Sequence, residues 1–143
     1  MPFVYVFDDA SVTQKEFPDI DLALFAKPNV SNKSTESPAA FLEAAGKSAR
    51  TKYKVAMAHG SVQIESKAAA DDLPITLREI ASSGMQYIAL GHWHGCQDFS
   101  FGGTTAWYAG SPEITYQEGK GGLGQGWAVS VEIDNGAVKA EPV

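Results

Sequence analysis

Short apolar runs of strand length recur through the first two thirds of the chain, and they restrict its fold more than any other feature. The runs cover residues 3–7, 21–25, 55–59 and 87–90. The first of them has almost no polar position, which is typical of a strand buried on both faces. Helix-like segments alternate with these strands. The pattern therefore predicts an α/β fold, in a single domain over residues 1–143.

Two helices are expected between the strands. Ser37 is a favourable N-cap for a first helix over residues 39–45, because its hydroxyl can accept a hydrogen bond from an unpaired backbone N–H at the helix start. Asp71 or Asp72 is expected to cap a second helix, which ends at Gly84. An apolar stripe on that second helix would pack against the sheet.

The last third of the chain has a different pattern, in which glycine-rich turns separate short strand-like runs. These runs cover residues 99–101, 104–109, 127–133 and 137–143. The dipeptide Asn135-Gly136 between the last two runs is a strong signal for a β-hairpin. An antiparallel meander is therefore expected to follow the strand-helix alternation.

Charge, cysteine content and hydropathy exclude several classes of protein. The net charge of −6 argues against a broad surface for duplex DNA, which would need clustered lysine and arginine. The single cysteine, Cys96, excludes an internal disulfide and fits a reducing compartment. The sequence shows no apolar run of transmembrane length and no signal-peptide pattern. We therefore expect a cytoplasmic protein with no membrane partner.

All three histidines of the chain, His59, His92 and His94, lie where an apolar run meets a glycine. In open α/β sheets, ligands bind at the carboxyl ends of the strands. The two-residue period of an extended chain would direct His92 and His94 to one side and Trp93 to the other. Two imidazoles on one face can ligate one metal ion or two adjacent ions. The histidines are therefore candidate metal ligands, with packing or hydrogen bonding as the alternative role.

Three other features have simpler interpretations. Residues 119–124 match the GxGxxG spacing, but a strand follows them where dinucleotide binding requires a helix. Asp8-Asp9 is interpreted as part of a turn rather than as a pair of metal-binding carboxylates. Cys96 is interpreted as a part-buried thiol, because a structural zinc site would normally show a second cysteine.

Three segments, taken together, resemble a known family. They are Ala58-His59-Gly60-Ser61, Gly91-His92-Trp93-His94 and Tyr108-Ala109-Gly110-Ser111-Pro112-Glu113. Their His-Gly, Gly-His-x-His and Gly-Ser-Pro-Glu steps look like those of the calcineurin-like metallophosphoesterases. The resemblance is closest to the branch that contains the SbcD-type DNA-repair exonucleases, and it extends from the expected third strand to the C-terminus.

This resemblance implies a fold and a chemistry. The family fold is a four-layer αββα sandwich with a two-metal site, usually Mn, Fe or Zn, at the rim of the sheets. By the motif match, His59 and His92 would bind one metal ion and His94 the other. The metals would bind a phosphodiester and activate a hydroxide for in-line attack. DNA ends are one candidate substrate.

The N-terminal motifs of the family, Asp-x-His, Gly-Asp and Gly-Asn-His-Asp or -Glu, are absent from this sequence. In the family they supply the bridging carboxylate, an asparagine ligand and the acid histidine. The chain thus resembles the C-terminal half of the domain, and alone it is expected to hold one metal ion or none, with weak or absent activity. We expect it to pair with another copy or with the missing N-terminal half, because a lone half leaves one sheet face uncovered.

Two alternatives stay open at this stage. The chain could be a catalytically inactive half-domain that acts by self-association or by docking a partner. It could instead be a mononuclear zinc hydrolase, in which three histidines bind one ion and a water completes the coordination.

Overall fold

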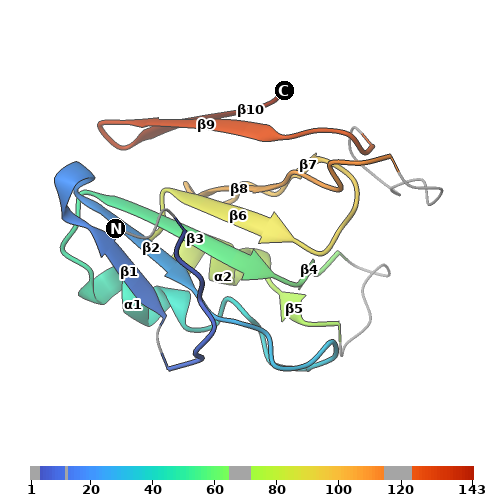
Figure 1. The fold of residues 1–143 in the computed structure, drawn as a ribbon, viewed down its shortest axis with the longest axis horizontal. Coiled ribbons are helices and arrows are strands. Elements are labelled where there is room, and N and C mark those ends of the chain that lie inside the picture. The colour runs from blue at the N-terminus through green and yellow to red at the C-terminus, as the bar shows by residue number, and fades with distance from the viewer. Residues whose placement is uncertain (1–3, 12, 65–71, 115–123) are drawn as a thin grey trace.

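A six-stranded mixed sheet forms the centre of the computed structural model, which describes residues 4–11, 13–64, 72–114 and 124–143 (Figure 1). In their order across the sheet, the strands are β1 (Gln14–Phe17), β2 (Leu22–Ala26), β3 (Tyr53–His59), β6 (Tyr87–Gly91), β8 (Thr105–Tyr108) and β7 (Gln97–Asp98). The four central strands are parallel, whereas the edge strands β1 and β7 are antiparallel to their neighbours. The expected α/β class is confirmed.

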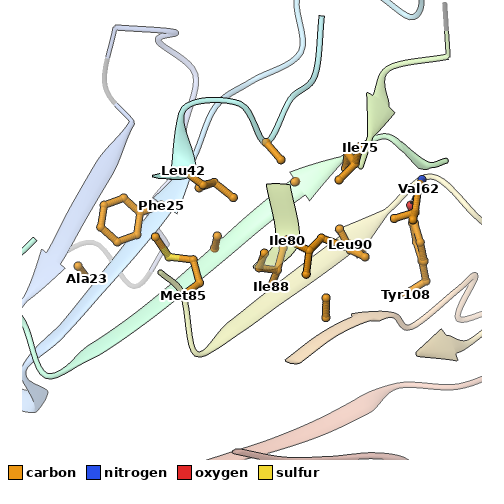
Figure 2. Close-up of a cluster of buried hydrophobic side chains, with 14 of the residues drawn as sticks. Ala23, Phe25, Leu42, Val62, Ile75, Ile80, Met85, Ile88, Leu90 and Tyr108 are labelled. Carbon is orange, nitrogen blue, oxygen red and sulfur yellow. Dashed lines mark hydrogen bonds between the residues drawn. The ribbon is translucent and has the colours of Figure 1, made fainter. Parts of the chain in front are cut away.

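Both helices, α1 (Leu42–Ser48) and α2 (Leu77–Ser82), cover the same face of this sheet (Figure 1). The strand order explains this arrangement, because β2, β3 and β6 follow one another in one direction and right-handed crossovers then place both helices on one side. The core lies between the helices and this face (Figure 2). Its fully buried members include Phe25, Leu42, Ile75, Ile80, Ile88 and Tyr108.

The two helices approach closely because Gly46 of α1 has no side chain. A Cβ at this position would lie 2.2 Å from the backbone oxygen of Ser83, directly after α2. At its other end α2 is capped by Thr76, which forms a capping box with Glu79. No helix among the described residues is long and apolar enough to cross a membrane.

The expected capping of the second helix by Asp72 is wrong. The residues after Asp72 form β5 (Pro74–Ile75), which is paired in parallel with β4 (Ser61–Val62). Residues in this extended pairing cannot also be helical, so the helix begins only after Thr76. The other expected cap, Asp71, lies outside the described residues.

The apolar run at the start of the chain does not form the expected strand within its described part, residues 4–7. The side chains of Val4 and Val6 are 73% and 65% exposed. The sheet edge is occupied instead by β1, which the 3-10 turn η1 (Pro18–Ile20) joins to β2. The run therefore crosses the sheet face that the helices leave open, where it lines a cavity together with β3 and β6 (Figure 1).

The last third of the chain is not one antiparallel meander, as the sequence pattern predicted. β8 enters the central sheet parallel to β6, and β7 forms in place of the expected strand over residues 99–101. β9 (Val129–Asp134) and β10 (Ala137–Pro142) form a separate antiparallel hairpin. Its turn residues Asn135 and Gly136 have φ angles of 48° and 87°, which confirms the predicted hairpin turn.

Candidate functional site

The carboxyl ends of β2, β3 and β6 bring polar side chains to one edge of the sheet. His59 is the last residue of β3 and pairs in register with Gly91, the last residue of β6, which His92 follows. Asn29 comes shortly after β2, and its side-chain Nδ2 donates a 2.8 Å hydrogen bond to the backbone oxygen of His59. This edge is the place where open α/β sheets bind ligands.

The rings of His59 and His92 are in edge-to-face contact, with centroids 5.4 Å apart and planes at 89°. Gly91 allows this approach, because a Cβ at that position would be 3.0 Å from the Nδ1 atom of His59. His92 itself has a φ angle of 123°, a conformation that a non-glycine residue rarely adopts. Backbone strain of this kind tends to occur at functional sites.

A carboxylate, Asp72, completes a row of three polar groups at this edge. Its Oδ2 atom lies 3.1 Å from Nε2 of His92, and both side chains are about one third exposed or less. Asp72 reaches the site through long-range pairing, since it forms a bridge with Ser34 and precedes β5. Sequence reasoning missed this role for Asp72. The sequence contains a Thr76-x-x-Glu79 capping box, which marks the true start of the helix. This signal could have shown that Asp72 is not the helix cap.

The neutral state of the His59 ring favours a role as a metal ligand. Burial lowers the pKa of His59 below its ordinary value of 6.5, and the neighbouring His92 lowers it further. At neutral pH the ring is therefore neutral and keeps a nitrogen lone pair, which is the form that binds metal ions.

His94 lies apart from this pair of rings. Its side chain is exposed, and among the described residues it does not line the cavity that His59 and His92 share. The expected alternation of His92 and His94 on one face of an extended chain is wrong, because β6 ends at Gly91 and the φ angle of His92 turns the backbone. The backbone oxygen of His94 instead accepts a 3.0 Å hydrogen bond from the N–H of Ser111.

Trp93 points into the core rather than toward a ligand. Its ring stacks on Tyr108 with centroids 5.6 Å apart, and Phe99 contacts both rings edge-on. Its Nε1–H donates a 2.9 Å hydrogen bond to the hydroxyl of Ser61, two residues after His59. Trp93 thereby ties the segment after β6 to the turn after β3.

The donor types at this edge suit a divalent metal ion, although the described residues include no group of three His, Cys, Asp or Glu side chains gathered around one point. His59 and His92 are in ring contact, and His92 and Asp72 are in hydrogen-bond contact. Imidazole nitrogen and carboxylate oxygen are common ligands of zinc, iron and manganese. This edge therefore supplies imidazole and carboxylate donors, but among the described residues it does not gather a full set of ligands around one ion.

A cavity of about 870 Å³ opens beside the histidine pair. Its polar lining residues are Lys27, Asn29, Ser31, Asn32, His59 and His92. The rest of the lining comes from residues 5–7, from the end of β2 and the segment after it, from Leu73, and from β3 and β6. Its size lies within the range of roughly 300–1,000 Å³ that is usual for small-molecule sites.

The other candidate motifs agree with their simpler interpretations where the structure describes them. The Asp9 carboxylate accepts hydrogen bonds from the backbone and hydroxyl of Ser11, which closes a turn and lowers the pKa of Asp9. Cys96 is buried, and its burial raises the pKa of the thiol. Residues 119–123 of the glycine-rich stretch lie outside the described residues.

Comparison with known proteins does not identify a function for this site. No family model matches the chain, and no curated protein matches it. The function of the chain is therefore inferred from the carboxyl edge of its sheet and from the three motif segments.

Proposed function

We propose that the chain is the C-terminal half of a metal-dependent phosphoesterase of the four-layer αββα type, acting on phosphodiesters, with DNA ends as one candidate. The convergence of the three motif segments carries this proposal. The N–H of Gly60 donates to the backbone oxygen of Gly91 at 3.1 Å, and the N–H of Ser111 donates to that of His94 at 3.0 Å. Segments about 30, and then 20, residues apart in sequence thus meet at one edge of one sheet.

In this proposal His59 and His92 bind one divalent metal ion, manganese, iron or zinc, and His94 binds a second when the domain is complete. The metal, when bound, polarises the phosphoryl group and supplies a nucleophile at neutral pH. Asp72 holds the ring of His92 in place through the 3.1 Å contact. Asn29 fixes the backbone of His59, and Lys27 adds positive charge to the lining of the cavity.

The missing layers of the sandwich are proposed to come from another chain or chain segment. Among the described residues, both helices lie on one face of the central sheet, and the opposite face keeps Met57 of β3 41% exposed. A second copy of the chain, or an N-terminal half with its own sheet, would cover this face.

The alternative proposal is an inactive half-domain that acts by self-association or by docking a partner. It is supported by the position of His94, whose exposed side chain does not join the pair formed by His59 and His92. With no third ligand gathered among the described residues, a metal ion would be held weakly.

Metal content per chain tests these proposals. Protein purified without chelator is compared with the His59→Ala, His92→Ala and His94→Ala variants, with the exposed Asp19→Ala as a matched control. We expect metal to be retained in the control and lost in His59→Ala and His92→Ala. Two ions that fall to one in His94→Ala would support the dinuclear site.

Other stoichiometries would change the assignment. A single zinc ion that is lost with any one of the three histidines would favour the mononuclear hydrolase. Absence of metal from the wild-type chain and from a mixture with a candidate N-terminal half would contradict the phosphoesterase and leave the inactive half-domain.

A further inference from the structure

The C-terminal hairpin takes no part in the core of the domain. β9 and β10 form a two-stranded sheet of their own, separate from the six-stranded sheet (Figure 1). Every residue of both strands is half-buried or exposed. A two-stranded hairpin is only marginally stable in water, and three or more strands with an apolar face are usually needed for independent stability. The hairpin would therefore gain stability from an added strand.

One face of the hairpin is apolar. Half-buried and exposed residues alternate along each strand, so the half-buried ones share a face. They are Val129, Val131, Ile133, Val138, Ala140 and Pro142. The exposed residues, which include Glu132 and Lys139, lie on the other face. A strand that extends this sheet must therefore be apolar on one face and polar on the other.

The hydrogen-bond register shows which backbone groups point away from the hairpin. Ala128 and Val143 exchange two backbone hydrogen bonds, of 3.1 and 2.9 Å. Along an antiparallel ladder, pairs that bond to each other alternate with pairs whose N–H and C=O groups point outward. The next pair, Val129 with Pro142, and every second pair after it therefore direct these groups to the outer edges.

The two outer edges are not equivalent. The edge of β9 presents the N–H and C=O groups of Val129, Val131 and Ile133. The edge of β10 is interrupted by Pro142, which has no N–H, and proline at such a position protects a sheet edge from pairing. Among the described residues, no other strand and no other backbone group pairs with the outer edge of β9. The edge that can accept a further strand is thus that of β9.

We infer that β9 pairs antiparallel with β9 of a second copy of the chain. The two hairpins then form one four-stranded sheet around a twofold axis at Val131. In this register Val131 faces its own counterpart, and Val129 faces Ile133 of the partner subunit on the apolar face. On the polar face, Ser130 faces Glu132 of the partner subunit, so like charges are not opposed.

Neighbouring registers are less favourable. A twofold axis at Glu132 would place this carboxylate opposite its own counterpart, and like charges directly opposite each other destabilise a sheet. An axis at Ser130 would leave Ile133 beyond the end of the partner's strand. The pairing goes beyond the proposed phosphoesterase function and needs no metal ion, because the three histidines all lie outside the hairpin.

Sedimentation equilibrium of the full chain in the presence of a chelator tests this inference. We expect a dimer in reversible equilibrium with the monomer. Val131→Pro removes an outward N–H from each copy but keeps every hydrogen bond within the hairpin, so it should weaken the dimer about tenfold or more. Ala140→Pro is the matched control, because Ala140 lies directly opposite Val131 and its N–H points to the other edge. This control should dimerise like the wild type.

A cysteine at the twofold axis gives a second test that does not depend on the folding of a proline variant. Across a hydrogen-bonded antiparallel pair, Cα atoms lie about 5.5 Å apart, which a disulfide can bridge. Val131→Cys should therefore form a covalent dimer under mild oxidation, and Ala140→Cys should not. The native Cys96 is buried and is common to both variants.

The outcomes are distinct from those of the metal test. A wild-type chain that stays monomeric at every concentration would overturn the inference, also where that monomer binds a candidate N-terminal half. A dimer that persists in folded Val131→Pro, or that cross-links equally through Ala140→Cys, would overturn it by placing the interface elsewhere. Each of these results leaves the phosphoesterase proposal standing, since metal content per chain decides that proposal.

Discussion

The hydroxyl of Tyr108 donates a 2.6 Å hydrogen bond to the backbone oxygen of Gly60 and accepts one of 3.0 Å from the N–H of Val62. Tyr108 ends β8, whereas the turn that it holds follows His59 at the end of β3. The side chain is fully buried, and burial raises the pKa of its hydroxyl well above the ordinary value. One side chain thus fixes the backbone immediately after a candidate ligand.

Replacing Tyr108 by phenylalanine should destabilise the fold. The ring would keep its packing against Trp93, but the oxygen of Gly60 and the N–H of Val62 would lose their buried partner. Leaving such groups unpaired costs about 1–3 kcal/mol. Chemical denaturation of Tyr108→Phe should show this loss, and Tyr5→Phe, at an exposed position, should change stability by less than about 0.5 kcal/mol. Equal stability of the two variants would show that the hydroxyl of Tyr108 is not a structural tie.

The carboxyl-edge position of the histidine pair could be predicted from the sequence because it depends on local patterns. An apolar run that ends in His-Gly or Gly-His identifies a strand end, and both β3 and β6 form where the pattern placed them. The fold class followed from the same alternation. Parallel strands then bring His59 and His92 together without any further specification.

The placement of His94, Asp72 and β8 depends on long-range strand pairing and on backbone angles, which the pattern of apolar residues does not encode. The alternation rule failed for His94 because His92 adopts a positive φ, which an extended register cannot anticipate. Asp72 was missed because only the pairing of β4 with β5 carries it to the site. The residue pattern of β8 also fits an antiparallel meander, because the direction of a strand is decided by its crossover and not by its residues.

The helix crossing predicts an unusual response to a substitution at Gly46. In a helix interior, glycine to alanine normally stabilises by about 1 kcal/mol. Here the added Cβ would lie 2.2 Å from the backbone oxygen of Ser83, and such overpacking costs about 1–3 kcal/mol. Gly46→Ala should therefore lower the midpoint of thermal unfolding. The reverse change at the exposed Ala44, Ala44→Gly, should also destabilise, by about 1 kcal/mol, which shows that ordinary propensity holds in α1. A stabilised Gly46→Ala would contradict the close crossing.

His59 should titrate below its ordinary pKa of 6.5 in the metal-free chain, because burial and then His92 disfavour its charged form. The unfolded chain therefore binds this proton more readily than the folded chain. The contribution of neutral His59 to stability is complete above pH 6.5 and is lost as the pH falls through the folded-state pKa. Proton NMR titration should show the low midpoint, a rise toward 6.5 in His92→Ala, and no change in His94→Ala. An unshifted midpoint in the wild type would contradict both the effect of burial and the electrostatic coupling of the two rings.

Gly91→Ala should separate the two histidines of the candidate site without unfolding the sheet. The added Cβ would lie 3.0 Å from Nδ1 of His59, so the ring must move, whereas the backbone of Gly91 has no positive φ that would strain alanine. Loss of ligand orientation lowers metal affinity by about 10- to 100-fold. Titration with Mn²⁺, together with the NMR shifts of the His59 ring, measures both effects. Gly103→Ala is the control for general destabilisation. Its added Cβ would have nothing within 4 Å, but the φ of 91° strains alanine at this position. Unchanged affinity in Gly91→Ala alongside a displaced His59 ring would show that His59 is not a metal ligand.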